Sequence, residues 1–158
     1  MSELVSNTTQ FFSGLDKAEK RLVKLFRMRI RILMSEGMRR MVARTPVHSG
    51  QAVMSYAAST GTPKPTNKSG YTPVEATNKL SLGSEKLRSA AASVALATLS
   101  AVDTADPFQA YYITNSAPHI GGLEYGALPF EPYTPRSPAG MFRVTNQELI
   151  TLLSSGKI

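Results

Sequence analysis

The sequence of 158 residues contains no cysteine and no tryptophan, and it has only two histidines. The absence of cysteine excludes disulfide bonds, thiol catalysis and zinc sites built from cysteine. The histidines, His48 and His119, stand in no H-x-x-x-H or H-E-x-x-H spacing, so we expect no metal site. No apolar run reaches the roughly 18 residues that a transmembrane helix requires.

Signatures of catalysis and of export are also missing. No serine lies in a G-x-S-x-G elbow, and Gly121-Gly122 is not followed by a phosphate-loop pattern. Glu124 and Glu131 are the only acidic pair in the Pro/Gly-rich stretch, and we interpret them as structural or surface residues. Residues 1–10 are polar and lack an apolar signal core, so we expect a protein made and folded in the cytoplasm. We therefore predict that the protein is not an enzyme and binds no cofactor.

Positive charge is in excess, and one segment carries it. Lysine and arginine number 18 against 11 acidic residues, a net charge of +7. Residues 16–44 contain ten of the basic and three of the acidic residues, which accounts for the whole excess. The charge indicates a polyanion or an acidic protein face as a partner, and the alternative is a solvated helix face.

The basic segment coincides with a predicted amphipathic helix at residues 15–43. Apolar residues cover about half of its circumference, and we interpret this arc as core rather than as a membrane-lying face. Arg29 and Arg40 break the pattern because they fall among the apolar positions, and Pro46 ends the helix. The basic residues opposite the arc are predicted to bind a partner: Lys17, Lys20, Arg21, Lys24, Arg27 and Arg31.

The rest of the chain predicts a mixed α+β domain. In it the long N-terminal helix packs on a small, mainly antiparallel sheet, with a second helix and a short C-terminal helix. Ser137 followed by Pro138 is a typical helix start. The further segments are predicted as strands at 51–59 and 108–115 and as helices at 84–101 and 138–153.

These elements predict one domain at residues 15–153, with tails at 1–14 and 154–158. Residues 61–82 are rich in proline, glycine, threonine, asparagine and lysine and predict a long loop. We expect this loop to be an assembly segment that becomes ordered against a neighbouring subunit.

Three segments, in order, resemble the signature of a known family. Residues 45–50 (TPVHSG) resemble its T-P-V-x-[TS]-G motif after a long N-terminal helix. Residues 112–119 (YITNSAPH), followed by LEYG at 123–126, resemble Y-x-T-N-x-x-P-Y and L-E-Y-G. Residues 137–145 (SPAGMFRVT) resemble A-P-A-G-M-V-R-x-T. The family is that of the neck or tail-completion proteins of tailed bacteriophages, which join the head to the tail.

The chain departs from the family pattern at two places. His119 stands where the family has tyrosine, and residues 127–134 are additional sequence. Proline and glycine in the motifs turn the chain or allow close backbone approach, so we expect the motifs to build the fold rather than to catalyse a reaction. The residues expected to do so are Thr45, Pro46, Gly50, Asn115, Glu124, Gly126, Pro138, Gly140 and Met141.

The resemblance implies a structural virion protein that forms a ring at the head–tail junction after assembly in the host cytoplasm. A hexamer is expected, with a dodecamer as the alternative, and the implied partners are connector or stopper proteins and tail-terminator or tail-tube proteins. No membrane is expected. The basic face would meet an acidic face of an adjacent ring or, without base reading, the DNA in the channel. The alternative hypothesis is a non-enzymatic nucleic-acid-binding protein that uses the basic helix.

Overall fold

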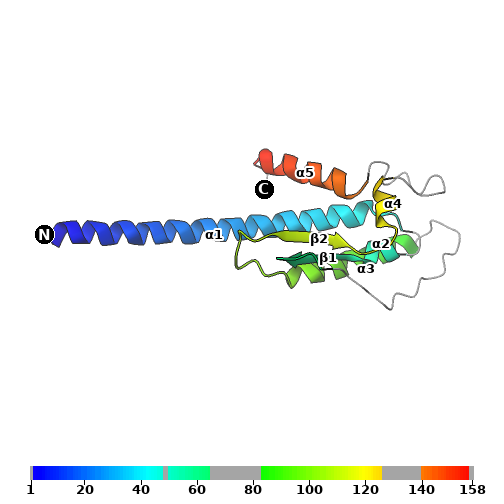
Figure 1. Cartoon of the computed structure of the whole chain (residues 1–158), viewed down its shortest axis with the longest axis horizontal. Coiled ribbons are helices and arrows are strands. Elements are labelled where there is room, and N and C mark those ends of the chain that lie inside the picture. The colour runs from blue at the N-terminus through cyan, green and yellow to red at the C-terminus, as the bar shows by residue number, and fades with distance from the viewer. Residues whose placement is uncertain (1, 48–49, 65–82, 126–139, 157–158) are drawn as a thin grey trace.

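One very long helix organises the structure. The computed structural model describes residues 2–47, 50–64, 83–125 and 140–156. Helix α1 (Ser2–Arg44) has 43 residues, and at about 1.5 Å per residue it is roughly 65 Å long. It runs along most of the molecule, and its N-terminal half projects beyond every other labelled element (Figure 1).

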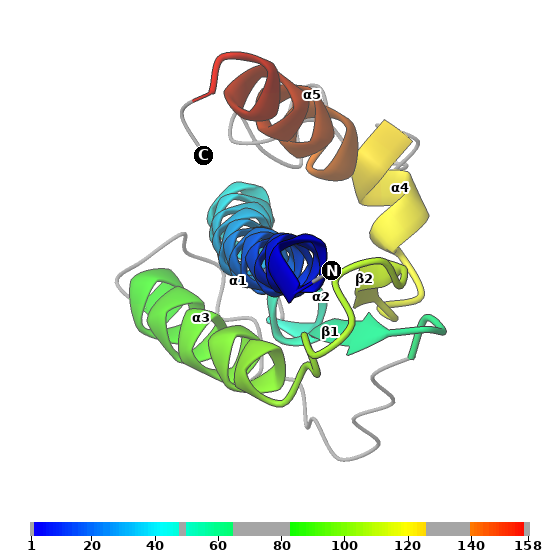
Figure 2. The ribbon, with the colours of Figure 1, turned by 90° about the vertical axis from the view of Figure 1, so that its left-hand side faces the viewer.

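The remaining elements gather along the C-terminal half of α1. In chain order they are α2 (Gln51–Met54), β1 (Tyr56–Thr60), α3 (Gly83–Ser100), β2 (Tyr111–Asn115), α4 (Ile120–Tyr125) and α5 (Phe142–Ser154). The two strands pair antiparallel, with Tyr56 opposite Asn115 and Thr60 opposite Tyr111. Viewed along α1, helix α5 lies on one side of it, and α3 and the strands lie on the other (Figure 2). The predicted α+β class is confirmed.

The main core lies where α1 meets α3 and β1. Alanines on α3 let the two helices approach closely, because no long side chain separates their backbones. The buried residues of this cluster are Met38, Met41, Val42, Val53, Tyr56, Ala91 and Ala95. A second cluster joins α2, α4 and the start of α5 through Ala52, Ala117, Leu123 and Met141.

The prediction of a strand at 51–59 is wrong in its first half. Gly50 adopts a left-handed φ of 82° and turns the chain into the single turn of α2. The Ser55 hydroxyl then donates a hydrogen bond of 2.7 Å to the carbonyl of Gln51 and closes that turn. Glutamine, alanine and methionine are good helix formers, and period-2 alternation over so few residues does not exclude a helical turn.

The helix boundaries also differ from those predicted. Helix α1 begins at Ser2 rather than near residue 15, so residues 2–14 are helical instead of a tail. Helix α3 agrees with its predicted range of 84–101. Helix α5 begins at Phe142, beyond the predicted start, and Ser137 and Pro138 lie outside the described residues, as do positions 65–82 of the predicted loop.

The second strand begins later than predicted. Strand β2 starts at Tyr111 instead of residue 108, because a turn precedes it. The backbone N–H of Phe108 donates to the carboxylate of Asp106 at 2.8 Å, and the Tyr111 hydroxyl donates to the Asp106 carbonyl at 2.6 Å. Local side-chain bonds of this kind compete with strand pairing.

Candidate functional site

Residues from the first and last sequence motifs meet in the interior. Thr45, which directly follows α1, is fully buried, and its hydroxyl donates to the carbonyl of Met41 at 2.7 Å. The same hydroxyl lies 2.8 Å from the Tyr56 hydroxyl, which in turn lies 3.9 Å from the sulfur of Met141. Tyr56 of β1 therefore connects the end of α1 with the start of α5.

Asn115, from the middle motif, ties the end of β2 to α2. Its side-chain amide donates to the carbonyl of Ala52 at 2.7 Å, and its side-chain oxygen accepts from the backbone N–H of Ala117 at 3.0 Å. A short amide that both donates and accepts suits this corner, because it binds a backbone carbonyl of α2 and a backbone N–H beyond β2 at the same time.

Glu124, also from the middle motif, holds the start of α5. Its carboxylate accepts hydrogen bonds from the backbone N–H groups of Met141, Phe142 and Arg143, at 2.7, 2.9 and 3.0 Å. Burial alone would raise the pKa of Glu124, but the three backbone donors and the Arg143 guanidinium hold that pKa below its ordinary value. A carboxylate at this helix end also meets the positive end of the helix dipole.

Gly140 allows the carboxylate to come so close. Its φ is 86°, a conformation that favours glycine. A Cβ at this position would lie 2.6 Å from Oε1 of Glu124, well inside van der Waals contact. The contact of Glu124 with Gly140 and Met141 therefore joins the middle motif to the last one.

These residues form what we call the motif cluster: Thr45, Tyr56, Asn115, Glu124, Gly140 and Met141. Burial raises the pKa of Tyr56 to about 12, so its phenol stays neutral and cannot serve as a base near neutral pH. Buried and internally bonded groups of this kind hold elements together. Pro46, as predicted, follows the end of α1, and Gly126 and Pro138 lie outside the described residues.

The predicted basic face divides into two parts. The side chain of Arg27 donates to the carbonyl of Ala105, and Arg31 Nε donates to the Thr104 hydroxyl at 3.0 Å. These two arginines hold the segment between α3 and β2 against α1. The other four side chains are exposed and form no ion pair with a described residue: Lys17, Lys20, Arg21 and Lys24.

The interpretation of the whole apolar arc as core is wrong for the N-terminal half of α1. We call residues 7–32 of α1 the arm, and we call one row of side chains on it the apolar stripe: Phe11, Leu15, Ala18, Leu22, Leu25 and Ile32. The five large side chains of the stripe are between 41% and 64% exposed. Burial on α1 begins only near Met34, where the other elements reach the helix.

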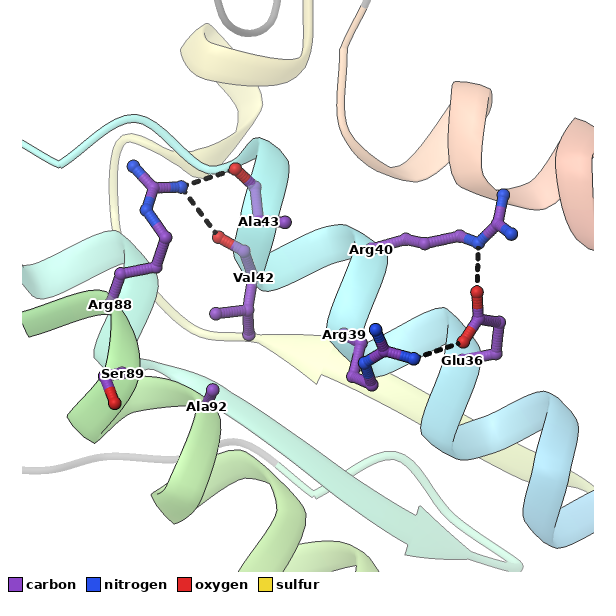
Figure 3. A pocket seen from close by; sticks show the side chains of 8 residues that line it. All are labelled: Glu36, Arg39, Arg40, Val42, Ala43, Arg88, Ser89 and Ala92. Carbon is purple, nitrogen blue, oxygen red and sulfur yellow. Dashed lines mark hydrogen bonds and ion pairs between the residues drawn. The ribbon is translucent and has the colours of Figure 1, made fainter. Parts of the chain in front are cut away.

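A cleft of about 350 Å³ lies between α1 and α3 (Figure 3). Its arginines are already engaged. Arg39 and Arg40 contact the carboxylate of Glu36 at 2.9 and 2.8 Å, and Arg88 donates to the carbonyls of Val42 and Ala43 at the end of α1. This engagement argues against a ready-made anion site and indicates that the cleft residues stabilise the end of α1.

Sequence reasoning missed the partner of Arg40, one of the two arginines that break the apolar pattern. Arg40 and Arg44 both bind Glu148 of α5, the latter at 2.6 Å. The hydrogen bond with Arg40 is the main reason that the pKa of Glu148 lies below its ordinary value. The spacing of Arg40 and Arg44 by four residues was a usable signal, because such residues share a helix face. Arg29 forms no ion pair with a described residue.

The described residues contain no candidate metal site and no candidate membrane-spanning helix. No group of three histidine or acidic side chains there could hold a metal ion. None of the helices searched there is both long and apolar enough to cross a membrane. Comparisons with protein-family models, curated proteins and solved structures find no significant match.

Proposed function

We propose that this protein is a structural subunit of a tailed-phage neck, where copies of it form a ring that joins the connector to the tail. The observation that carries the proposal is the contact among residues of three separate motifs. Thr45, Asn115 and Met141 all approach Tyr56, and Glu124 caps the helix that follows Met141. Segments that resemble one family are thus the segments on which this fold depends, which supports a likeness of fold rather than chance.

The arm supports a role in assembly. A helix that projects from its own domain with large apolar side chains exposed needs a partner to cover them. Contacts that repeat head to tail between copies of one chain close into a ring when the rotation between neighbouring subunits closes. We propose six copies, with twelve as the alternative, beside connector or stopper and tail-terminator or tail-tube proteins.

The test is inactivation of the gene in a phage that carries it. We expect filled heads and finished tails that stay separate, and we expect joining to recover when the wild-type protein is supplied. Connector and tail-tube genes should lie beside this gene, and a reconstruction of the neck should contain a symmetric ring of this chain. Normal particles after inactivation, or one asymmetric copy in the neck, would contradict the proposal.

The exposed basic residues favour a second candidate function, non-enzymatic binding of nucleic acid. Lys17, Lys20, Arg21 and Lys24 project on the arm without ion-pair partners among the described residues. Phosphate contacts alone would give affinity that falls steeply with salt and shows no sequence preference. Binding of duplex DNA at physiological salt by the purified protein, with no effect of gene inactivation on head–tail joining, would favour this function.

A further inference from the structure

The spacing of the apolar stripe is that of a helix that packs against other helices. From Phe11 to Ile32 its members follow at alternating intervals of four and three residues. Arg29 occupies the one position of this series that is not apolar. This is the heptad spacing of apolar residues with which helices pack side by side. In a solvated helix the apolar residues follow no such repeat.

Nothing in the described part of the chain covers this stripe. Helix α5 lies on the same side of α1 but only along its C-terminal half, where Leu149 approaches Gly37 and Glu148 binds Arg40. The segment between α3 and β2 contacts the base of the arm through Arg27, Arg31 and the ring pair of Phe26 and Phe108. A lone helix draws little stability from propensity, so the arm needs packing from outside its own subunit.

The width of the apolar surface indicates more than one neighbouring helix. Phe12 and Phe26 each follow a member of the stripe and widen it on one side. Phe12 is 58% exposed and Phe26 is 44% exposed. A strict two-position seam suits a pair of helices, whereas three apolar positions in seven suit a helix in a bundle of several.

The charges beside the stripe determine which neighbour fits. At 100° per residue, Asp16 and Glu19 lie on one flank of the stripe, and Lys17 and Arg21 lie on the other. When parallel helices surround an axis with their stripes inward, the acidic flank of each meets the basic flank of the next. When two helices pair antiparallel about a two-fold axis, like flanks meet. Flanking charges of this kind set the orientation of helices more than their affinity.

We propose that the arms of several copies of this chain pack side by side, parallel, with their apolar stripes facing one another and their basic faces outward. This inference rests on the self-association in the proposed function, but not on a position in a phage neck. Arg29 then lies where the arms diverge toward their wider domains, because only there does a guanidinium in the stripe stay hydrated. A membrane fits the stripe less well, since Arg29 would then lie on the centre line of the side that faces the lipid.

The first experiment measures self-association of the full-length protein by sedimentation, from micromolar to millimolar concentration. We expect the wild type to form oligomers and the double variant Leu15→Asp/Leu22→Asp to associate at least about tenfold more weakly. Both leucines are exposed in the single subunit, so thermal unfolding of the domain should change little. The matched control Thr9→Asp/Ser13→Asp adds the same two charges on the opposite, exposed side of the arm and should associate like the wild type.

The second experiment determines orientation and exploits the absence of cysteine from the chain. Ala18→Cys and Leu25→Cys are each placed alone in the stripe and cross-linked with a short bifunctional reagent. In a parallel bundle both variants link to their own copies. In an antiparallel pair at most one of them does, and Lys24→Cys on the outward face should not link in either case.

Three results would overturn the inference: oligomers that persist in the Leu15→Asp/Leu22→Asp variant, an antiparallel cross-linking pattern, or a wild type that stays monomeric. Flotation of that monomer with anionic lipid vesicles, lost in the same variant, would assign the stripe to a membrane instead. The proposed function fails separately. If the protein forms parallel oligomers but its loss leaves heads and tails joined, this inference holds and the proposed neck function is rejected. If phage with the Leu15→Asp/Leu22→Asp variant join normally, the proposed neck function can hold and the packing of the arms is rejected.

Discussion

The two halves of α1 belong to one continuous helix, yet they lie in opposite environments. Met38 is 1% exposed between α3 and β1, whereas Met28 on the arm is 53% exposed. The covered half also has its charges matched, since Arg40 and Arg44 bind Glu148. Hydrophobic periodicity therefore shows which side of a helix seeks cover, but not whether the same chain supplies it.

The comparison also shows that the helix has two distinct apolar faces. The side of the helix that carries Lys24, Arg27 and Arg31 is the side on which the buried Met38 and Val42 lie farther along. These five residues follow one another at intervals of three, four, seven and four residues. The apolar stripe instead continues into the side that α5 covers. The single broad arc inferred from the sequence merges these two faces, and for this reason the sequence predicts one core.

The first way to sharpen the comparison is to truncate one methionine in each half. We expect Met38→Ala to lower the free energy of unfolding by about 3 kcal/mol, because it removes buried surface and leaves a cavity. Met28→Ala, the matched control on the arm, should lower it by less than about 0.5 kcal/mol. Urea unfolding of dilute protein measures both, and equal losses would mean that the arm is covered within the subunit.

A matched pair of carboxylates gives the next largest effect. Glu124→Gln replaces an acceptor of three backbone N–H groups by a side chain whose amide faces donors, so we expect a loss of about 2 kcal/mol. Glu19→Gln on the arm removes an exposed charge and should cost less than about 0.5 kcal/mol. A negligible cost at Glu124 would show that the motif cluster does not hold α5.

The same carboxylate makes stability depend on pH. The pKa of Glu124 is lower in the folded state than its ordinary value of 4.5. Its contribution is therefore complete above that value and is lost as the pH falls through the folded pKa. Urea midpoints should fall in acid for the wild type and fall less for Glu124→Gln. The dependence that remains is expected to include Glu148, whose pKa is also lowered and which Glu148→Gln removes.

The sequence predicted the architecture well because it rests on local signals. The ranges of α3 and of the C-terminal half of α1 follow from apolar spacing and from Pro46. The importance of Glu124 and Gly140 came from the family resemblance, but their mutual contact could not be derived. Glu124 accepts from backbone groups 17 to 19 residues away, and that bond depends on the position of α5 rather than on any side-chain pattern.

The N-terminal extent of α1 could not be predicted for a different reason. The predicted tail at residues 1–14 includes the polar stretch 1–10, whereas in the structure the helix begins at Ser2. Ser13-Gly14, a dipeptide typical of turns, stands directly before the predicted start at residue 15, yet the structure continues the helix through both residues. The sequence likewise places Arg27 and Arg31 in one binding face, whereas in the structure their side chains bind residues 104–105 of the same chain.

The smallest effect on stability is expected for the outer part of the basic face. Replacing Lys17, Lys20, Arg21 and Lys24 by glutamine should change the free energy of unfolding by less than about 0.5 kcal/mol, since these side chains are exposed. Glutamine keeps most of the length and the helix propensity and removes only the charge. For the proposed neck subunit, however, we expect heads and tails that form but fail to join, because the charges proposed to attract an acidic ring are lost.

A control variant, Arg27→Gln/Arg31→Gln, separates binding from folding. It releases the segment at Thr104 and Ala105, so we expect a measurable loss of stability of about 1 kcal/mol in place of a pure joining defect. Milder single changes among the outer four should show joining defects that low salt relieves, since weaker screening strengthens the charges that remain. If the fourfold variant instead yields infectious particles at the normal level, the outer basic residues are only solvated, and the two halves of α1 differ in apolar cover alone.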